Sequence, residues 1–287
     1  MHTDRASLSE NPRVAVCLSG QPRTFERCIG SIIKAFEGFR VDWFIGTWAT
    51  SENFAAVANA IDGKMQPAMQ EYVSEPSLVR QERKILESFI DSFPDFFILH
   101  QWYGVSRAMK LRNEWCQREG VEHDIIVRCR FDLDLKFSFA DALKNFVPDA
   151  VHMTKAQQGG GDQFFFGTPD TMTRLVDFPH WLVSYGDRFG TEYGFFATPL
   201  LRAFFLDNRI RVNTLDMPLR IVRPPMSGSP REVREQRTRD YIARTFPDMA
   251  DHAWVGERIP KTKTPAPWDK GYPANAGLFL RNGEPVT

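Results

Sequence analysis

The chain has 287 residues, of which 43% are hydrophobic and 25% charged, the composition of an ordinary folded domain. Lys plus Arg and Asp plus Glu both number 36, so the overall charge favours neither nucleic acid nor an acidic membrane surface as a partner. No apolar run approaches the length of a transmembrane helix, and the first residues lack the apolar region of a secretion signal. We therefore expect a cytoplasmic protein, with peripheral attachment at the inner membrane left open.

The four cysteines show neither a CxxC pair nor a zinc spacing. Three of the four lie inside apolar patterns, so we expect buried, reduced thiols.

Strand and helix patterns alternate over the first 135 residues. Apolar runs predict strands at Val14–Leu18 and Val41–Trp48. Helical spacing predicts helices at Phe25–Phe36, Gln81–Phe93 and Trp102–Glu119, the last with Gly120 as its C-cap. Between these elements we expect a weak helix within residues 51–70 and an extended segment at Glu71–Val79. Such alternation predicts an α/β fold with a mostly parallel central sheet flanked by helices.

A loop of small and polar residues, Ser19 to Arg23, follows the first strand. α/β folds place nucleotide ligands in such loops, at the carboxyl end of a strand and the start of a helix. A plain strand-to-helix turn explains the loop equally well, because it carries neither GxGxxG nor a Walker lysine.

The middle of the chain carries the strongest chemical pattern. Ile125-Ile126-Val127 suits a strand buried on both faces, and Arg128, Arg130, Asp132 and Asp134 follow at alternate positions. If the extended conformation continues, all four side chains lie on the same side. Two carboxylates there suit Mg²⁺ or Mn²⁺ carrying a diphosphate. An internal ion pair between Arg128 and Asp132 is the structural alternative.

A glycine-rich loop, Gly159-Gly160-Gly161, leads through Asp162 and Gln163 into a predicted strand at Phe164–Gly167. Such a loop fits an active-site lid, and a hairpin turn is the alternative. Glu192 is conspicuous at the head of an apolar segment, Thr191–Phe205, although a carboxylate favoured by a helix dipole explains it too.

The remaining patterns predict helices at Phe139–Phe146, Thr171–Tyr185 and Arg231–Phe246, and strands at Ala150–Met153 and Arg209–Arg220. The composition shifts at Arg223 towards proline, glycine and charge. We therefore expect a leader at 1–12, a catalytic domain at 13–222 and an appendage of a helix and an extended arm at 223–287.

Three stretches, VAVCLSGQPRTF, DIIVRCRFDLDL and GGGDQFFFGTPDTM, carry a family resemblance. Over roughly residues 12–222 the chain resembles nucleotide-sugar-dependent glycosyltransferases of the GT-A type, and more closely bacterial and viral polysaccharide-associated proteins. The resemblance implies a Rossmann-like GT-A fold and a DxD motif, Asp132 and Asp134, that binds Mn²⁺ or Mg²⁺ with the donor diphosphate. Arg128 and Arg130 depart from that pattern, and as phosphate binders they leave the metal dependence open.

The predicted reaction is transfer of a sugar from a nucleoside-diphosphate or nucleoside-monophosphate sugar to a hydroxyl of a glycan or another acceptor. Asp162, and after it Glu192, is the candidate base for an inverting reaction, and both would bind sugar hydroxyls in a retaining one. The residues expected to bind the donor are Ser19, Gly20, Gln21, Arg23, Arg128, Arg130, Asp132 and Gln163.

Two other classes stay open. A metal-independent α/β transferase, such as a sulfotransferase, would use the Ser19–Arg23 loop to bind a phosphate. A non-catalytic scaffold in polysaccharide assembly would keep the fold without turnover.

Overall fold

The computed structural model describes residues 8–9, 11–73, 83, 97–154, 162–189, 197–223, 230–249, 279–281 and 284–285. The strands of its main sheet are β1 (Arg13–Ser19), β2 (Arg40–Trp48), β3 (Met69–Val73), β4 (Ile125–Arg130), β6 (Ala150–Thr154), β7 (Phe164–Gly167), β8 (Arg211–Leu215), β10 (Phe279–Arg281) and β11 (Glu284–Pro285). A second, two-stranded antiparallel sheet pairs β5 (Leu133–Leu135) with β9 (Leu219–Ile221).

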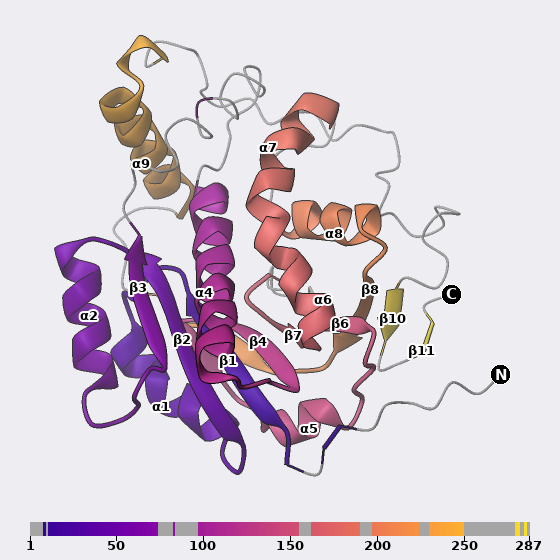
Figure 1. Cartoon of the computed structure of the whole chain (residues 1–287). Helices are drawn as coiled ribbons and strands as arrows, with labels where there is room; N and C mark the ends of the chain where they lie inside the picture. The colour runs from indigo at the N-terminus through magenta and orange to yellow at the C-terminus, as the bar shows by residue number, and fades with distance from the viewer. Residues whose placement is uncertain are drawn as a thin grey trace.

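The main sheet has the order β11-β10-β8-β6-β7-β4-β1-β2-β3. All of its strands run in one direction except β7, which lies antiparallel between β4 and β6, and β11 at the edge. The expected α/β fold with a mostly parallel sheet flanked by helices is therefore confirmed (Figure 1).

The α-helices are α1 (Phe25–Ala35), α2 (Ser51–Ile61), α4 (Phe97–Glu119), α5 (Phe139–Leu143), α6 (Pro169–Met172), α7 (Phe178–Phe189), α8 (Ala197–Asp207) and α9 (Pro230–Thr245). Two 3₁₀ helices, η3 (Thr173–Asp177) and η4 (Pro247–Met249), complete the set within the described ranges. As predicted, Gly120 ends α4 with a positive φ of 63°.

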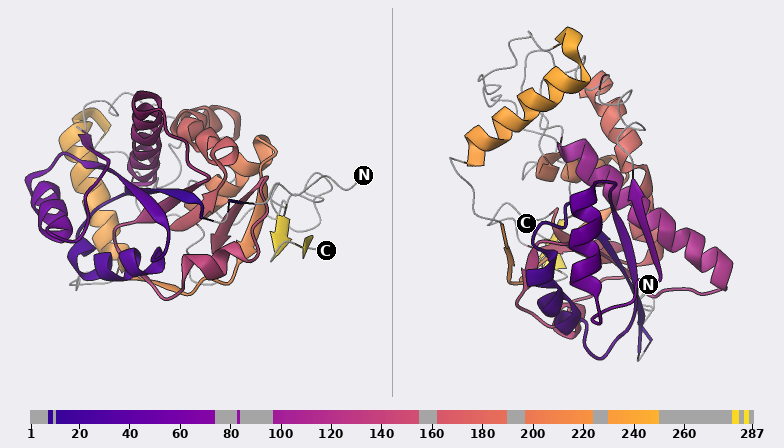
Figure 2. Two further views of the ribbon diagram at one scale, coloured as in Figure 1. Left: turned by 60° about the horizontal axis from the view of Figure 1, so that its bottom comes forward. Right: turned by 90° about the vertical axis from the view of Figure 1, so that its left-hand side faces the viewer.

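The helices cover the two faces of the sheet, and a large apolar core lies on each face. The α4-side core joins α4, α7 and α8 to one face, and the α1-side core joins α1, α2 and α5 to the other (Figure 2). Alternation along β1 explains the division, because Ala15 and Cys17 face α4 while Val16 and Leu18 face α1. In β4, Ile126 likewise faces α4, so Arg128 and Arg130 extend towards the same side.

The expected continuation of β4 to Asp134 is wrong. The strand ends at Arg130, a turn follows at Phe131 and Asp132, and β5 then belongs to the second sheet. Packing explains the turn, since the fully buried Phe131 meets Phe25 of α1 edge to face at 4.8 Å between ring centroids. The four charged side chains therefore do not form one row.

Two other segments are divided where one element was expected. The predicted strand Arg209–Arg220 is split into β8 and β9 around Pro218, which has no N–H for a ladder. The predicted helix Thr171–Tyr185 is split into α6, η3 and α7, with Pro179 near the start of α7. The predicted helix Gln81–Phe93, apart from Arg83, lies outside the described residues.

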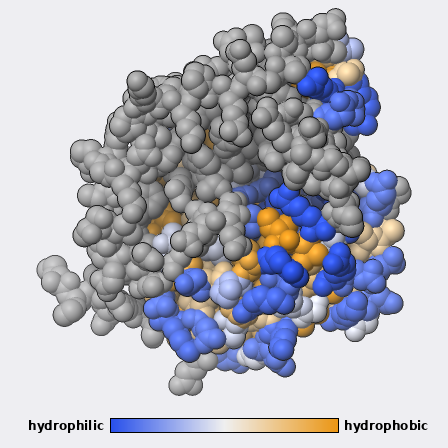
Figure 3. All heavy atoms as spheres, turned by 180° about the vertical axis from the view of Figure 1, so that it is seen from behind, coloured by the Kyte–Doolittle hydropathy of each residue, from blue (hydrophilic) through white to orange (hydrophobic). Residues whose placement is uncertain are grey.

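The chain end reaches the sheet. Residues Phe279–Arg281 pair in parallel with β8, so part of the expected appendage adds strands to the main sheet, and the domain division at residue 223 stays a prediction. Among the described helices, none combines the length and apolar character needed to cross a bilayer. Seen from behind, much of the described surface is hydrophilic, and an apolar area lies near the middle of the view (Figure 3).

Candidate functional site

The strand order reverses between β1 and β4. From β1 the chain continues outwards to β2 and β3, and then returns to place β4 on the other side of β1. In open α/β sheets, ligands bind at the carboxyl ends of the strands that flank such a switch point. Ser19 and Arg130 are register partners there, at the last positions of β1 and β4. We call this side of the sheet the carboxyl edge.

The antiparallel direction of β7 brings two more predicted residues to the carboxyl edge. Asp162 and Gln163 precede Phe164, the first residue of β7, and each is 5% exposed. Near the start of α4, the amide of Gln101 donates from Nε2 to Oδ2 of Asp162 over 2.7 Å. The Asp162 carboxylate is thus fixed by a neutral donor and lies in the electrostatic field of Arg128 and Arg130.

Arg128 is fully buried at this edge. Its Nη1 donates to the carbonyl oxygen of Gln163, and its guanidinium lies over the Phe165 ring, 5.9 Å from the centroid. Burial, with a contribution from Arg130, lowers the pKa of Arg128 to about 10, so the side chain is still a cation at neutral pH. Its Nε and Nη2 have no hydrogen-bond partner among the described residues.

Two neutral hydrogen-bond donors near Arg128 are also buried and without a partner among the described residues. Ser19 and Trp102 are both 0% exposed, and the Ser19 hydroxyl and the indole Nε1 of Trp102 find no partner in the described part of the chain. Helix α4 passes close by, because a Cβ placed on Gly104 would lie 3.9 Å from Ser19 Cβ and 3.9 Å from the Gly20 nitrogen. Buried donors without a partner cost free energy, which favours a site that is completed by acceptor atoms.

Arg130 and Asp132 form a two-point ion pair. The Arg130 Nε donates to Oδ1 of Asp132 over 2.7 Å, and Nη2 donates to Oδ2 over 2.6 Å. Burial opposes the charge of Arg130, yet the Asp132 carboxylate outweighs it and raises the pKa of Arg130. The sequence left open an ion pair between Arg128 and Asp132; in the structure Arg130 is the arginine that pairs with Asp132.

Asp134 has different partners. Lys136 Nζ lies 2.9 Å and Arg220 Nη2 3.2 Å from its Oδ2. Partial desolvation opposes ionisation, but these two cations lower the pKa of Asp134. Since Asp134 lies in β5, it does not continue the row that ends at Arg130.

The side chains around the DxD motif do not fit a preformed metal site. Asp132 and Asp134 are each neutralised by cationic side chains, and within the described ranges no three Asp, Glu, His or Cys side chains gather closely enough to hold a metal ion. A divalent ion needs several oxygen ligands that are not already occupied. The expected Mn²⁺ or Mg²⁺ remains a prediction that these residues do not support.

The structure brings together only part of the predicted Ser19–Arg23 loop. Ser19 is buried at the switch point, and Gly20 adopts a φ of 115° while its carbonyl accepts a 2.7 Å hydrogen bond from Thr47 Oγ1. Gln21 and Arg23 are exposed on the way to α1. Glu192 and the three glycines before Asp162 lie outside the described residues, so their predicted roles stay predictions.

The sequence patterns missed the contribution of helix α4 and of Val222. Gln101 and Trp102 reach the site because α4 begins at the carboxyl edge, a tertiary fact with no local signal. Val222 joins the two halves of the edge: its N–H donates to the Asp132 carbonyl over 2.8 Å, and its carbonyl accepts from Thr24 Oγ1 over 2.6 Å.

Aromatic side chains gather beside the site at the end of β2. Trp48 lies 4.7 Å from the His100 ring and 6.3 Å from the Tyr103 ring, measured between centroids, and Tyr241 of α9 contacts His100 at 5.6 Å. Trp48 and Tyr241 are both buried, and both contact the His100 ring. Such packing is typical of aromatic side chains in a protein core.

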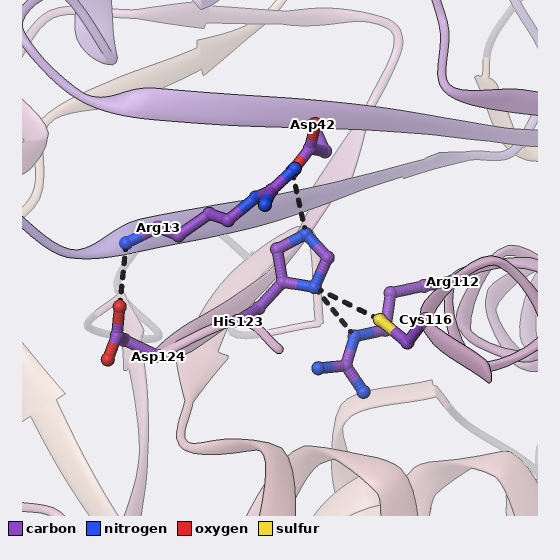
Figure 4. Close-up of polar contacts among 6 residues, drawn as sticks. All are labelled: Arg13, Asp42, Arg112, Cys116, His123 and Asp124. Carbon is purple, nitrogen blue, oxygen red and sulfur yellow. Dashed lines mark hydrogen bonds and ion pairs between the residues drawn. The ribbon is translucent and has the colours of Figure 1, made fainter. Parts of the chain in front are cut away.

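A second polar cluster lies near the amino ends of β1 and β4. Cys116 Sγ lies 3.3 Å from Nδ1 of His123, and Nε2 of His123 lies 3.0 Å from Oδ2 of Asp42. Figure 4 shows that His123 lies between Asp42 on one side and Cys116 and Arg112 on the other. Arg13 Nε also donates to Asp42, over 2.5 Å. The order Cys, His, Asp is that of a nucleophile, its base and the residue that orients the base.

The electrostatics of this cluster oppose thiol catalysis. Arg112 Nε donates to Nδ1 of His123 over 3.2 Å, so the nitrogen that would accept the thiol proton is already engaged. Burial, together with the Arg112 charge, lowers the pKa of His123 to about 4, and burial raises the pKa of Cys116. His123 is therefore a neutral structural residue that ties α4 to β2.

Comparisons with known proteins give little beyond these observations. No protein-family model and no curated protein matches the chain. Among solved structures, mouse xyloside xylosyltransferase 1 in its apo form has 9% identity and a TM-score of 0.37, with 90% of this chain and 99% of that chain covered. Galactosyltransferase LgtC, in complex with donor and acceptor sugar analogs, has 11% identity and a TM-score of 0.42, with 91% of each chain covered. Likeness at this level carries no argument about activity.

Proposed function

We propose that the protein is a glycosyltransferase that moves a sugar from a nucleoside-diphosphate sugar to a hydroxyl of a carbohydrate acceptor. The observation that carries the proposal is Arg128, fully buried at the switch point with Nε and Nη2 unpartnered within the described residues. Guanidinium groups match the oxygens of phosphate in charge and geometry. A diphosphate between β1 and β4 would supply the acceptors that Arg128 and Ser19 need.

Arg128 also suits the chemistry of the leaving group. When the bond from the sugar to the diphosphate breaks, negative charge grows on the diphosphate oxygens. Donors that are already fixed in place stabilise that charge without reorganisation. The Arg128 guanidinium is held by the Gln163 carbonyl oxygen and by the Phe165 ring, so its remaining N–H groups are in place before the nucleotide sugar binds.

Asp162 is the group that we propose for the acceptor. Its carboxylate is held by Gln101, and it lies in the field of Arg128 and Arg130. In an inverting reaction it would accept the proton of the attacking hydroxyl. In a retaining reaction it would bind a sugar hydroxyl. Glu192 is the second candidate on sequence grounds alone.

One observation favours a second candidate function. The charges near the DxD motif are balanced by arginine and lysine side chains, and we assign no step to a divalent ion. A metal-independent transfer from a phosphoadenosine donor, as in sulfotransferases, needs phosphate-binding cations without metal ligands. The two candidate functions differ in the donor molecule, and in both of them Arg128 binds a phosphate group of that donor.

A thermal-shift screen separates the candidates. The purified chain is heated with UDP-, GDP-, CMP- and dTDP-sugars and with a phosphoadenosine donor, each with Mn²⁺ and with EDTA. A ligand that binds only the folded state raises the melting temperature. We expect one nucleotide sugar to raise it, and Arg128→Lys to lose most of that shift. Arg211→Lys is the matched control, because Arg211 pairs with Asp149 at the other end of the sheet.

Turnover then follows from release of the free nucleotide in the presence of glycan acceptors. Stabilisation by the phosphoadenosine donor alone would move the assignment to sulfuryl transfer. Binding without any release of nucleotide would favour the non-catalytic scaffold. Absence of any shift would contradict the donor site itself.

A further inference from the structure

Asp132 occupies the face of Arg130 that a phosphate group would take. Both Nε and Nη2 of Arg130 are engaged by the two carboxylate oxygens at 2.7 and 2.6 Å. That planar, two-point arrangement is the one by which arginine also binds phosphate. Arg128, two residues earlier on the same face of β4, instead keeps Nε and Nη2 without a partner in the described part of the chain. The Asp132 carboxylate thus occupies Arg130, whereas no such anion occupies Arg128 among the described residues.

The Arg130–Asp132 pair lies at the solvent boundary. The side chains of Arg130 and Asp132 are 24% and 14% exposed, whereas Arg128 is fully buried. An incoming anion would therefore meet Arg130 before it reaches Arg128.

The backbone of Asp132 is held in place independently of its side chain. Its carbonyl accepts the N–H of Val222 over 2.8 Å, and the Val222 carbonyl accepts the hydroxyl of Thr24 over 2.6 Å. Rotation of the Asp132 side chain away from Arg130 therefore leaves both of these contacts intact. The pair can exchange its anion without unfolding the turn.

We infer that Asp132 is a resident counter-ion of Arg130 that the diphosphate of the substrate displaces, and that it is not the first ligand of a metal ion. The inference rests on the proposed function for the identity of the diphosphate. Asp132 then competes with the ligand for one guanidinium. Removal of its charge strengthens binding, whereas removal of a metal ligand weakens it, so the two roles predict opposite signs.

The test is titration calorimetry, in EDTA and separately with Mn²⁺, with inorganic pyrophosphate, UDP, GDP and adenosine 3′,5′-bisphosphate, the product of a phosphoadenosine donor. We expect Asp132→Asn to lower the Kd for pyrophosphate roughly 3- to 5-fold, the size of a lost competing ion pair. Asp149→Asn is the matched control, since Asp149 also pairs with an arginine, Arg211, at 2.6 Å. The Kd of the Asp149→Asn variant for pyrophosphate should equal that of the wild type.

Two further variants check that the effect comes from the ion pair with Arg130. Asp132→Ala removes the acceptor atoms as well as the charge and should shift affinity in the same direction. In an Arg130→Gln background, Asp132→Asn should change the Kd by less than about twofold, because the competed guanidinium is gone. Melting temperatures without ligand verify that each variant is folded.

The outcomes distinguish the inference from the proposed function. Weaker or unchanged pyrophosphate binding in Asp132→Asn, or binding that requires Mn²⁺ and is lost in this variant, overturns the inference. The glycosyltransferase proposal survives that result if a nucleoside diphosphate binds the wild type. Tighter pyrophosphate binding with no nucleotide bound by any variant supports the counter-ion and overturns the donor assignment. No binding to any variant overturns both.

Discussion

At the scale of single residues, neutral groups hold two of the charged side chains of the site. Gln163 contributes a backbone oxygen to Arg128, and Gln101 contributes an amide N–H to Asp162. The Gln101 amide holds the Asp162 carboxylate without adding a further cation beside it. Gln101 therefore acts as a positioning residue for Asp162 in the proposed reaction.

Replacement of Gln101 by leucine removes the N–H that Asp162 accepts at 2.7 Å. Hydrogen bonds to charged groups contribute roughly 1.5–3 kcal/mol, so we expect kcat/KM for sugar transfer to fall about 10- to 100-fold. Gln117→Leu, on the exposed far end of the same helix, is the control. A kcat/KM equal to that of the wild type would assign Gln101 to structure alone.

At the scale of elements, close approach of α4 to the sheet creates the site. A Cβ added to Gly46 in β2 would lie 3.0 Å from the Ala108 nitrogen and 3.0 Å from the Gly104 carbonyl oxygen, both backbone atoms of α4. Because Gly46 has no side chain, helix α4 packs closely against β2, with Gln101 and Trp102 at the carboxyl edge. Helix α4 and strand β2 form one packed unit.

Gly46→Ala is expected to lower the melting temperature, because one of two backbones must shift, and overpacking of this kind costs about 1–3 kcal/mol. Gly30→Ala is a matched glycine substitution with the opposite expected sign. Gly30 is exposed within α1 and has open space around the added Cβ, so alanine should stabilise the helix by up to about 1 kcal/mol. Chemical unfolding of both variants measures the difference, and equal effects would contradict the close-packing argument.

The sequence predicted these elements where the signal is local. The apolar runs of β1, β2, β4, β6 and β7 and the helical spacing of α1 and α4 were sufficient to predict a mostly parallel sheet. The buried thiols of Cys17, Cys28 and Cys129 were also anticipated. The turn after Arg130 could not be predicted, because it depends on Phe131 packing against Phe25, a contact across more than a hundred residues.

The candidate site follows the same rule. The sequence placed Ser19, Arg128 and Asp162 near one edge of the sheet because the apolar runs of β1, β4 and β7 can be read from it. The partners of Arg130 and Asp134 were not identified, because Arg220 comes from β9 and joins Asp134 only in the folded chain. Gln101 carried no motif at all.

At the scale of the whole molecule, two buried histidines link folding to pH. Burial, followed for His123 by the Arg112 charge, lowers the pKa of His123 and of His152 to about 4. Nε2 of His152 accepts the Val147 N–H over 2.8 Å, and its ring is stacked between Phe146 and Phe166. Both rings are therefore neutral in the folded protein at pH 5.5, where the unfolded chain is already protonated.

These two histidines do not reduce the free energy of unfolding above pH 6.5. As the pH falls from 6.5 towards 4 they lower it, because the unfolded state then binds more protons than the folded state. We expect a loss on the order of 3 kcal/mol per histidine at pH 4. Urea unfolding between pH 7 and pH 4.5 measures the slope. His152→Gln keeps an acceptor for Val147 and should flatten it, whereas His180→Gln, at an exposed position, should not. A slope unchanged by His152→Gln would contradict the assignment.

The position of β7 has a consequence for the newly synthesised chain. β7 is four residues long and lies between β4 and β6, both of which precede it in the sequence. Until Phe164–Gly167 has been made and inserted, β4 presents an unpaired row of N–H and C=O groups beside the apolar side chains of Ile126 and Val127. Unpaired apolar strand edges are sites of intermolecular pairing. Chains that stop before Phe164 are therefore expected to aggregate, and the same insertion that completes the sheet ends that risk.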